Sequence, residues 1–270
     1  MARQYTGTVG ETANCQVGVF LAYASRKGAA FLDRALSLPR SWTDDPDRCQ
    51  AAGVPTDVRF VTKIVLARRM LERAFAAAVP AGWVVADCFY GRSHAFRRWL
   101  EAREQPYVLQ VPKTNTVWYE GCRQTAAQLG EQLPAAAWTR RSVGHGVQGD
   151  RCALWACLPL SDACPEGKRR WLLLQQDLED ASVRACHLAY GPADTPEAEL
   201  LRVCGSRWQI EEGFAQAKGE VGLDQYEVRT WTAWHRFVTL CLLAHADLVV
   251  TRCAANAEEH AAEKGGPAPI

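Results

Sequence analysis

The sequence predicts an α/β fold with a mixed, partly parallel sheet and flanking helices. Along residues 3–111, short apolar segments typical of buried strands alternate with segments of helical period. Residues 112–197 break this alternation with short apolar segments between Gly-, Pro- and Ser-rich connections, which indicates a β-rich insertion. From residue 198 the pattern is helical again. A chain of 270 residues is long enough for one large domain with such an insertion.

The chain is expected to begin with an antiparallel hairpin. Residues 3–9 read as a short strand and residues 14–24 as a second, more apolar strand, with glycines in the turn between them. Residues 31–61 are expected to be irregular, because several prolines in this stretch break any long helix.

Two helices and two strands are predicted to follow in alternation. Thr62 is a suitable N-cap for the first helix, since apolar residues recur after it with helical period. Residues 83–86 form a short buried strand that leads directly into Asp87. Ser93 is the candidate cap of the second helix, and residues 107–111 form the next strand.

Four segments are expected along the chain. They are the first part of the core (1–111), the β-rich insertion (112–197), the C-terminal helices of the core (198–253) and a disordered tail (254–270). Residues 234–250 are predicted to form a strongly apolar final helix. The tail is assigned to disorder because it is rich in Ala, Glu, Gly and Pro.

The composition describes a globular chain without a strong overall charge. Lys and Arg together number 31 against 30 Asp and Glu, so no global basic field indicates nucleic-acid binding, although a local basic groove remains compatible with this balance. No apolar run of membrane-span length and no signal-peptide pattern is evident, so a cytoplasmic protein without a membrane partner is expected. The 11 Cys residues form no C-x-x-C pair, which argues against zinc and against a disulfide framework.

Residues 207–218 carry the most informative pattern. On a helix each residue advances by about 100°, so Arg207, Glu211 and Lys218 project from one face. A carboxylate between two cations suits a metal-assisted site that acts on a polyanion, and an ordinary surface ion pair of Arg207 with Glu211 is the alternative. The opposite face is predicted to pack in a core through Ile210, Phe214, Ala217 and Val221.

Asp87 is the second candidate site residue. A carboxylate at the C-terminal end of a buried strand lies at the edge of an α/β sheet where ligands commonly bind. The alternative is an Asp that forms a turn or caps a helix.

Both segments resemble motifs of bacterial insertion-sequence DDE transposases. In that family Tyr, Arg, Glu and Lys recur at a fixed spacing, which Arg207, Glu211 and Lys218 match, while Cys204 stands in the Tyr position. Residues 86–91, Ala-Asp-Cys-Phe-Tyr-Gly, resemble the motif around the second catalytic Asp. The resemblance extends from about residue 3 to residue 250 and includes the segments 3–8, 41–45 and 222–229.

The resemblance implies an RNase H-like fold and metal-dependent cleavage and transfer of DNA strands at insertion-sequence ends. Asp87 and Glu211 would then be catalytic ligands in a site for two Mg²⁺ or Mn²⁺ ions. DNA contacts are implied for Arg207, Lys218, Trp208 and Tyr90, although an aromatic such as Trp208 is also typical of a helix core. The implied partners are the transposon ends and a second copy in a homodimer, in the bacterial cytoplasm at the nucleoid.

The first catalytic Asp of the family has no identified counterpart in this chain. In the family it lies on the first strand, shortly before the segment that matches residues 3–8, so the sequence predicts a truncated, defective copy whose first strand is absent. A non-catalytic DNA-binding or regulatory fragment and another RNase H-like nuclease remain as alternatives. The basic pairs and triplets at residues 140–141 and 168–170 read as solvated surface, and His145 has no assigned mechanism.

Overall fold

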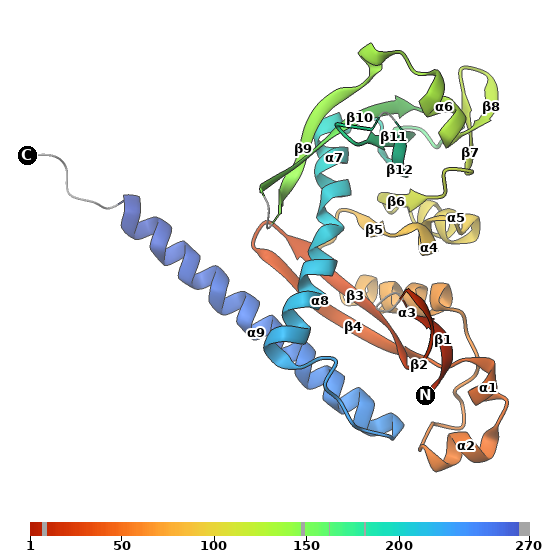
Figure 1. The fold of residues 1–270 in the computed structure, drawn as a ribbon, viewed down its shortest axis with the longest axis vertical. Coiled ribbons are helices and arrows are strands. Elements are labelled where there is room, and N and C mark those ends of the chain that lie inside the picture. Colours follow the sequence, from red (N-terminus) through yellow and green to blue (C-terminus); the bar gives the residue numbers. More distant parts are fainter. Residues whose placement is uncertain (7–9, 147–148, 162, 181, 265–270) are drawn as a thin grey trace, which may run out of the picture. The chain divides into compact units, whose positions relative to one another are not determined.

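The chain has a mixed α/β fold, as predicted, and divides into two compact units (Figure 1). The computed structural model describes residues 1–6, 10–146, 149–161, 163–180 and 182–264. Unit 1 combines residues 1–79 with residues 209–270, and unit 2 is the continuous stretch 80–208.

Unit 1 contains two antiparallel hairpins. β1 (Ala2–Thr6) pairs with β2 (Glu11–Cys15), and β3 (Val17–Ser25) pairs with β4 (Gly28–Ser37). The chain therefore begins with an antiparallel hairpin, as predicted, but its second strand is β2 (Glu11–Cys15). Most of the strand predicted over 14–24 is β3, which pairs with β4 instead. β4 lies in the stretch expected to be irregular. It is rich in Ala, which is a weak strand former, and its pairing with β3 overrides that local preference.

Three helices follow the hairpins. Two short ones, α1 (Arg40–Thr43) and α2 (Pro46–Ala51), lie where irregular chain was expected, and Asp45 caps α2 by accepting a hydrogen bond from Arg48 N at 3.0 Å. The predicted long helix is confirmed as α3 (Lys63–Ala76), which Thr62 caps through Val65 N.

The C-terminal helices α8 (Trp208–Val221) and α9 (Trp231–Lys264) complete unit 1. The predicted apolar face of α8 is confirmed, since Ala217 is buried in the unit 1 core and Ile210, Phe214 and Val221 pack against it. Three phenylalanines join the elements, with ring centroids of Phe20 and Phe31 lying 5.2 and 4.7 Å from that of Phe214.

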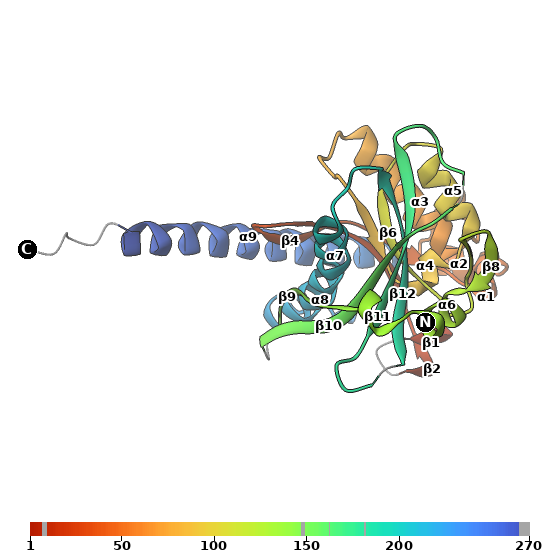
Figure 2. The same ribbon diagram turned by 90° about the horizontal axis from the view of Figure 1, so that it is seen from above.

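α9 is one continuous helix, longer than predicted (Figure 2). It covers residues 254–264, which were expected to be disordered, because this Ala- and Glu-rich stretch has high helix propensity. The rest of the expected tail, 265–270, lies outside the described residues.

Unit 2 is built on one mixed sheet of six strands. Their order is β5 (Val84–Ala86), β6 (Tyr107–Val111), β12 (Val183–Pro192), β11 (Lys168–Gln176), β10 (Gly149–Pro159) and β9 (Thr139–Gly146). β5 and β6 are parallel, and the other neighbours are antiparallel. The predicted strands 83–86 and 107–111 are confirmed, and so is the β-rich character of the following stretch. The boundary expected at residue 112 falls inside this sheet, because β12 pairs directly with β6.

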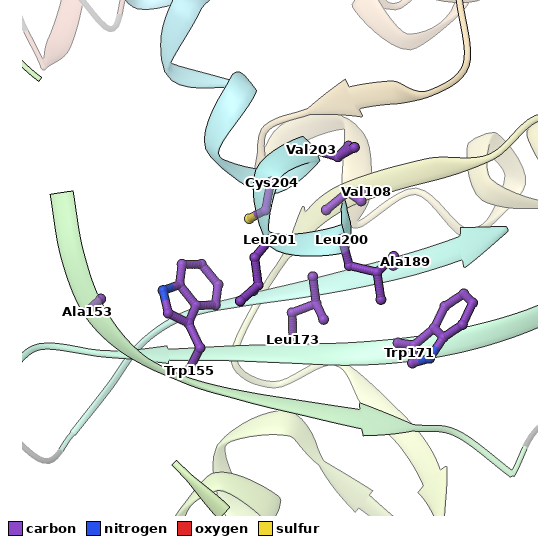
Figure 3. Packing of buried hydrophobic residues seen from close by; sticks show 10 residues of the cluster. All are labelled: Val108, Ala153, Trp155, Trp171, Leu173, Ala189, Leu200, Leu201, Val203 and Cys204. Carbon is purple, nitrogen blue, oxygen red and sulfur yellow. The ribbon is translucent and has the colours of Figure 1, made fainter. Parts of the chain in front are cut away.

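Helices cover both faces of the sheet. α7 (Glu197–Ser206) packs on one face, where Leu200 and Leu201 lie over Leu173 and Ala189 (Figure 3). The other face carries α4 (Cys88–Gly91), α5 (His94–Glu101) and α6 (Ala126–Gln132). A two-stranded hairpin of β7 (Thr116–Tyr119) and β8 (Cys122–Thr125) precedes α6, and the short helix η1 (Ala135–Ala137) follows it.

A half-buried ion pair fixes α5 to the sheet. Glu101 receives hydrogen bonds from Arg170 Nε at 3.0 Å, from Arg170 Nη2 at 2.7 Å and from Tyr107 Oη at 2.7 Å. The Glu101 and Arg170 side chains are only 15% and 23% exposed. Arg170, predicted as solvated surface, is therefore a structural residue. Burial acts to raise the pKa of Glu101, but the hydrogen bonds from Arg170 and Tyr107 outweigh it and lower the pKa below the ordinary value.

Replacing Glu101 with Gln is expected to lower the free energy of unfolding by about 2 kcal/mol at pH 7, because Arg170 loses its charged acceptor. A lowered folded-state pKa stabilises the fold above the ordinary Glu pKa, and this contribution is lost as the pH falls through the lowered value. The difference between wild type and variant should therefore shrink below about pH 4. Denaturant unfolding at several pH values measures it. Asp177→Asn, in an exposed pair with Arg184, is the control and should cost less than about 0.5 kcal/mol.

Candidate functional site

Asp87 lies directly after β5, at the C-terminal end of that strand. Ala86, the last residue of β5, pairs with Leu109 of β6, and Asp87 is the N-cap of α4. Its Oδ1 accepts hydrogen bonds from Phe89 N at 2.9 Å and from Tyr90 N at 3.4 Å. The side chain is nevertheless exposed. Because both bonds go to Oδ1, the carboxylate can cap α4 and still present Oδ2 to a ligand.

Close packing of α4 on β6 fixes the Asp87 carboxylate. A Cβ on Gly91 would overlap the carbonyl oxygen of Gln110 and lie 2.9 Å from the carbonyl carbon. Arg97 of α5 donates a hydrogen bond to the carbonyl of Gly91. Residues 88–91 form the short helix α4, and only Gly at position 91 allows this helix to approach β6 so closely. Spacing alone could not reveal this requirement, because Gln110 lies far away in sequence.

Tyr90 is the aromatic neighbour of the carboxylate. Burial, and then the negative charge of Asp87, raise the pKa of Tyr90 to about 12, so its phenol stays protonated at physiological pH. The pKa of Cys88 is also raised, mainly by burial, with Arg92 acting to lower it and Asp87 to raise it. The Cys88 thiol is therefore a poor nucleophile. Tyr90 can donate a hydrogen bond at this end of the sheet.

Arg207 and Trp208 lie at the end of the unit 2 chain. The predicted helix over 198–220 is interrupted at Arg207, which is the C-cap of α7, so the helix that carries Glu211 begins after it. Trp208 is 39% exposed. This exposure is larger than expected for the alternative interpretation, in which Trp208 is an aromatic residue of a helix core. Cys204, at the family's Tyr position, lies on the buried face of α7 and packs in the unit 2 core.

His187 is a buried polar residue that the sequence did not single out. It lies on β12 and is 6% exposed, with its ring centroid 6.0 Å from that of Trp155. Burial, with a smaller contribution from the charge of Arg207, lowers the pKa of His187 to about 3. The imidazole is therefore neutral at physiological pH, and its ring lies beside that of Trp155 on β10.

Glu211 and Lys218 lie on α8 in unit 1. Glu211 is exposed in the first turn and Lys218 is half-buried in the last turn, positions that the helix dipole favours for these charges. Two turns separate them, so they share one face of α8. Asp87, Tyr90, Arg207 and Trp208 belong to unit 2 instead.

The chemistry of these side chains suits a hard metal ion. Asp87 and Glu211 are exposed carboxylates, and oxygen donors of this kind select Mg²⁺ or Mn²⁺. Within the described ranges, no three His, Cys, Asp or Glu side chains gather as a ready metal-binding group. Of the other basic candidates, Arg141 lies 3.9 Å from Glu197, and His145 lies on β9 with a side chain outside the described part of the chain.

The comparisons with known proteins address the first half of the chain. Residues 1–140 match the family described as DDE superfamily endonuclease. The match includes β5, Asp87 and Tyr90 and ends before α8, so Glu211 and Lys218 lie outside it. A comparison with curated proteins gives no match. Because the matched residues make up more than half of the 270, the chain belongs to the DDE superfamily endonucleases.

Proposed function

We propose that this DDE superfamily endonuclease is a transposase of a bacterial insertion sequence, with an RNase H-like core that acts on DNA at the nucleoid. The observation that carries the proposal is the setting of Asp87. Its exposed carboxylate is held at the C-terminal end of β5 by two backbone N–H groups, inside the stretch that matches the family. The motif around Glu211 supports it through resemblance.

Asp87 and Glu211 are the proposed ligands of Mg²⁺ or Mn²⁺. When bound, two such ions would activate a water or a 3′-hydroxyl and stabilise the oxygen that leaves the scissile phosphate. Arg207 and Lys218 are the proposed phosphate contacts, which would hold the DNA backbone in register without reading its sequence. The exposed indole of Trp208 offers a face on which a base could stack, and the protonated phenol of Tyr90 offers a donor.

Two-metal chemistry of the DDE type uses three carboxylates, and the sequence identifies two of them. We therefore propose that this copy binds metal and DNA but cleaves DNA inefficiently by itself. Binding and cleavage are then separable properties, and each needs its own measurement.

The test uses the purified full chain with the DNA that flanks its own gene. We expect DNA binding that weakens steeply with salt, Mn²⁺ binding by calorimetry, and nicking of supercoiled plasmid close to background. A chain that binds neither Mn²⁺ nor DNA contradicts the proposal. Rapid metal-dependent nicking would contradict only the proposed inefficiency of cleavage, and it would support the proposed metal-dependent cleavage of DNA. Equal cleavage of unrelated duplexes and RNA–DNA hybrids favours a general RNase H-like nuclease instead.

A further inference from the structure

The outer face of α9 carries an exposed apolar stripe. Leu240 and Leu243 are each 66% exposed, and Val250 is 67% exposed. The opposite face of the same helix is buried, with Trp234, Val238 and Leu242 in the unit 1 core. Three large apolar side chains on one side of a helix are a surface that a partner is expected to cover.

The spacing of the stripe is that of a helix that pairs with another helix. Arg236, Leu240, Leu243, Asp247 and Val250 follow one another at alternating intervals of four and three residues. This is the seam pattern of a two-stranded coiled coil, in which such residues face the partner helix. At about 100° per residue they fall within an arc of about 80°. All five are exposed.

The two charges in the seam define the partner. Arg236 and Asp247 have no ion-pair partner in the part of the chain that the structure describes. Their positions are symmetric about the midpoint between Leu240 and Leu243. A second copy of α9 running antiparallel about that midpoint would therefore set Leu240 against Leu243 and Arg236 against Asp247. The same symmetry sets Ala233 against Val250.

We propose that the occupant of this stripe is α9 of a second copy of the chain, in an antiparallel pair over residues 231–252. Such a pair would be about 33 Å long at 1.5 Å per residue. A parallel pair is disfavoured because it would set Arg236 against Arg236 and Asp247 against Asp247. The proposal depends only on α9 and does not rest on the proposed DNA chemistry.

A lipid bilayer fits the stripe less well. Residues Trp231–Ala257 are long and apolar enough to cross a membrane, judged by length and composition. A helix in a bilayer would have to leave the unit 1 core and bury Arg236 and Asp247 in lipid, which is costly. Pairing with a second copy keeps the core and satisfies both charges.

Charge reversal tests the pairing in the full chain. Arg236→Asp and Asp247→Arg each set like charges against one another at two symmetric places, so each should weaken dimerisation roughly tenfold or more. The double variant restores opposite charges and should return the dissociation constant to within about threefold of wild type. Asp224→Arg, an exposed site in the same unit but off α9, is the matched control and should change nothing. Sedimentation equilibrium measures the dissociation constant, and thermal unfolding checks that each variant folds.

Several outcomes would overturn the proposal. If the wild-type chain is a monomer at all accessible concentrations, the α9 pairing is excluded. The proposed metal-dependent action on DNA would not be affected by this result. Dimers that both single reversals leave intact, or that the double variant fails to restore, would also exclude the pairing. Monomeric wild-type chain that floats with phosphatidylglycerol vesicles would identify a membrane surface as the occupant.

Discussion

Replacing Asp87 with Asn is expected to abolish metal binding at this residue while leaving the fold intact. Asn caps helices about as well as Asp, so the bonds to Phe89 and Tyr90 are kept and the free energy of unfolding should change by less than about 0.5 kcal/mol. The lost charge removes the ligand, and Mn²⁺ affinity should fall by more than about tenfold. Calorimetric Mn²⁺ titration and thermal unfolding of the same samples measure the two effects.

The controls separate the two roles of Asp87. Asp87→Ala removes the cap as well as the charge, so it should cost about 1 kcal/mol of stability in addition to the metal affinity. Asp45 is a matched control because it is also an exposed Asp that caps a short helix, and Asp45→Asn should change neither quantity. Unchanged Mn²⁺ affinity in Asp87→Asn would mean that Asp87 is a structural cap only.

Replacing Gly91 with Ala is expected to destabilise unit 2 by about 3 kcal/mol. Ala gains about 1 kcal/mol of helix propensity over Gly, but its Cβ would overlap the backbone carbonyl of Gln110, which cannot rotate away as a side chain could. The clash outweighs the propensity, and α4 must move off β6. The melting temperature of unit 2 should fall by roughly 10 °C.

The matched control for this glycine is Gly82→Ala. Gly82 lies in the same unit, and an added Cβ there would meet no atom within 4 Å. It should change the melting temperature by no more than about 2 °C. If Gly91→Ala melts like wild type, α4 does not pack as closely on β6 as described, and the rigid placement of Asp87 would be wrong.

Local signals in the sequence predicted two helix starts and two strands well. Thr62 and Ser93 cap their helices as predicted, because a cap depends only on residues within one turn. The strands β5 and β6 were also predicted correctly, because short apolar runs between turn residues are typical of buried strands. The position of Asp87 at the C-terminal end of β5 followed from that pattern.

Pairing between distant segments was not predictable in the same way. β4 was missed because its Ala-rich sequence favours a strand only when β3 lies beside it. The continuation of the β5–β6 sheet into β12 depends on a contact between residues far apart in sequence, which no local pattern encodes. For the same reason, the sequence does not show that position 91 must be Gly, because the requirement comes from the close contact of Gly91 with the backbone of Gln110.

The division of the chain has a consequence for the order of folding during synthesis. Unit 2 is one continuous stretch, so all its strands and helices are synthesised before α8 and α9. Unit 1 draws on both ends of the chain, and the core residue Phe31 must wait for Phe214 and His245 to cover it. The β3–β4 hairpin therefore exposes apolar surface for most of translation. Nascent chains should be most dependent on chaperones in that interval, before α9 packs on the β3–β4 hairpin.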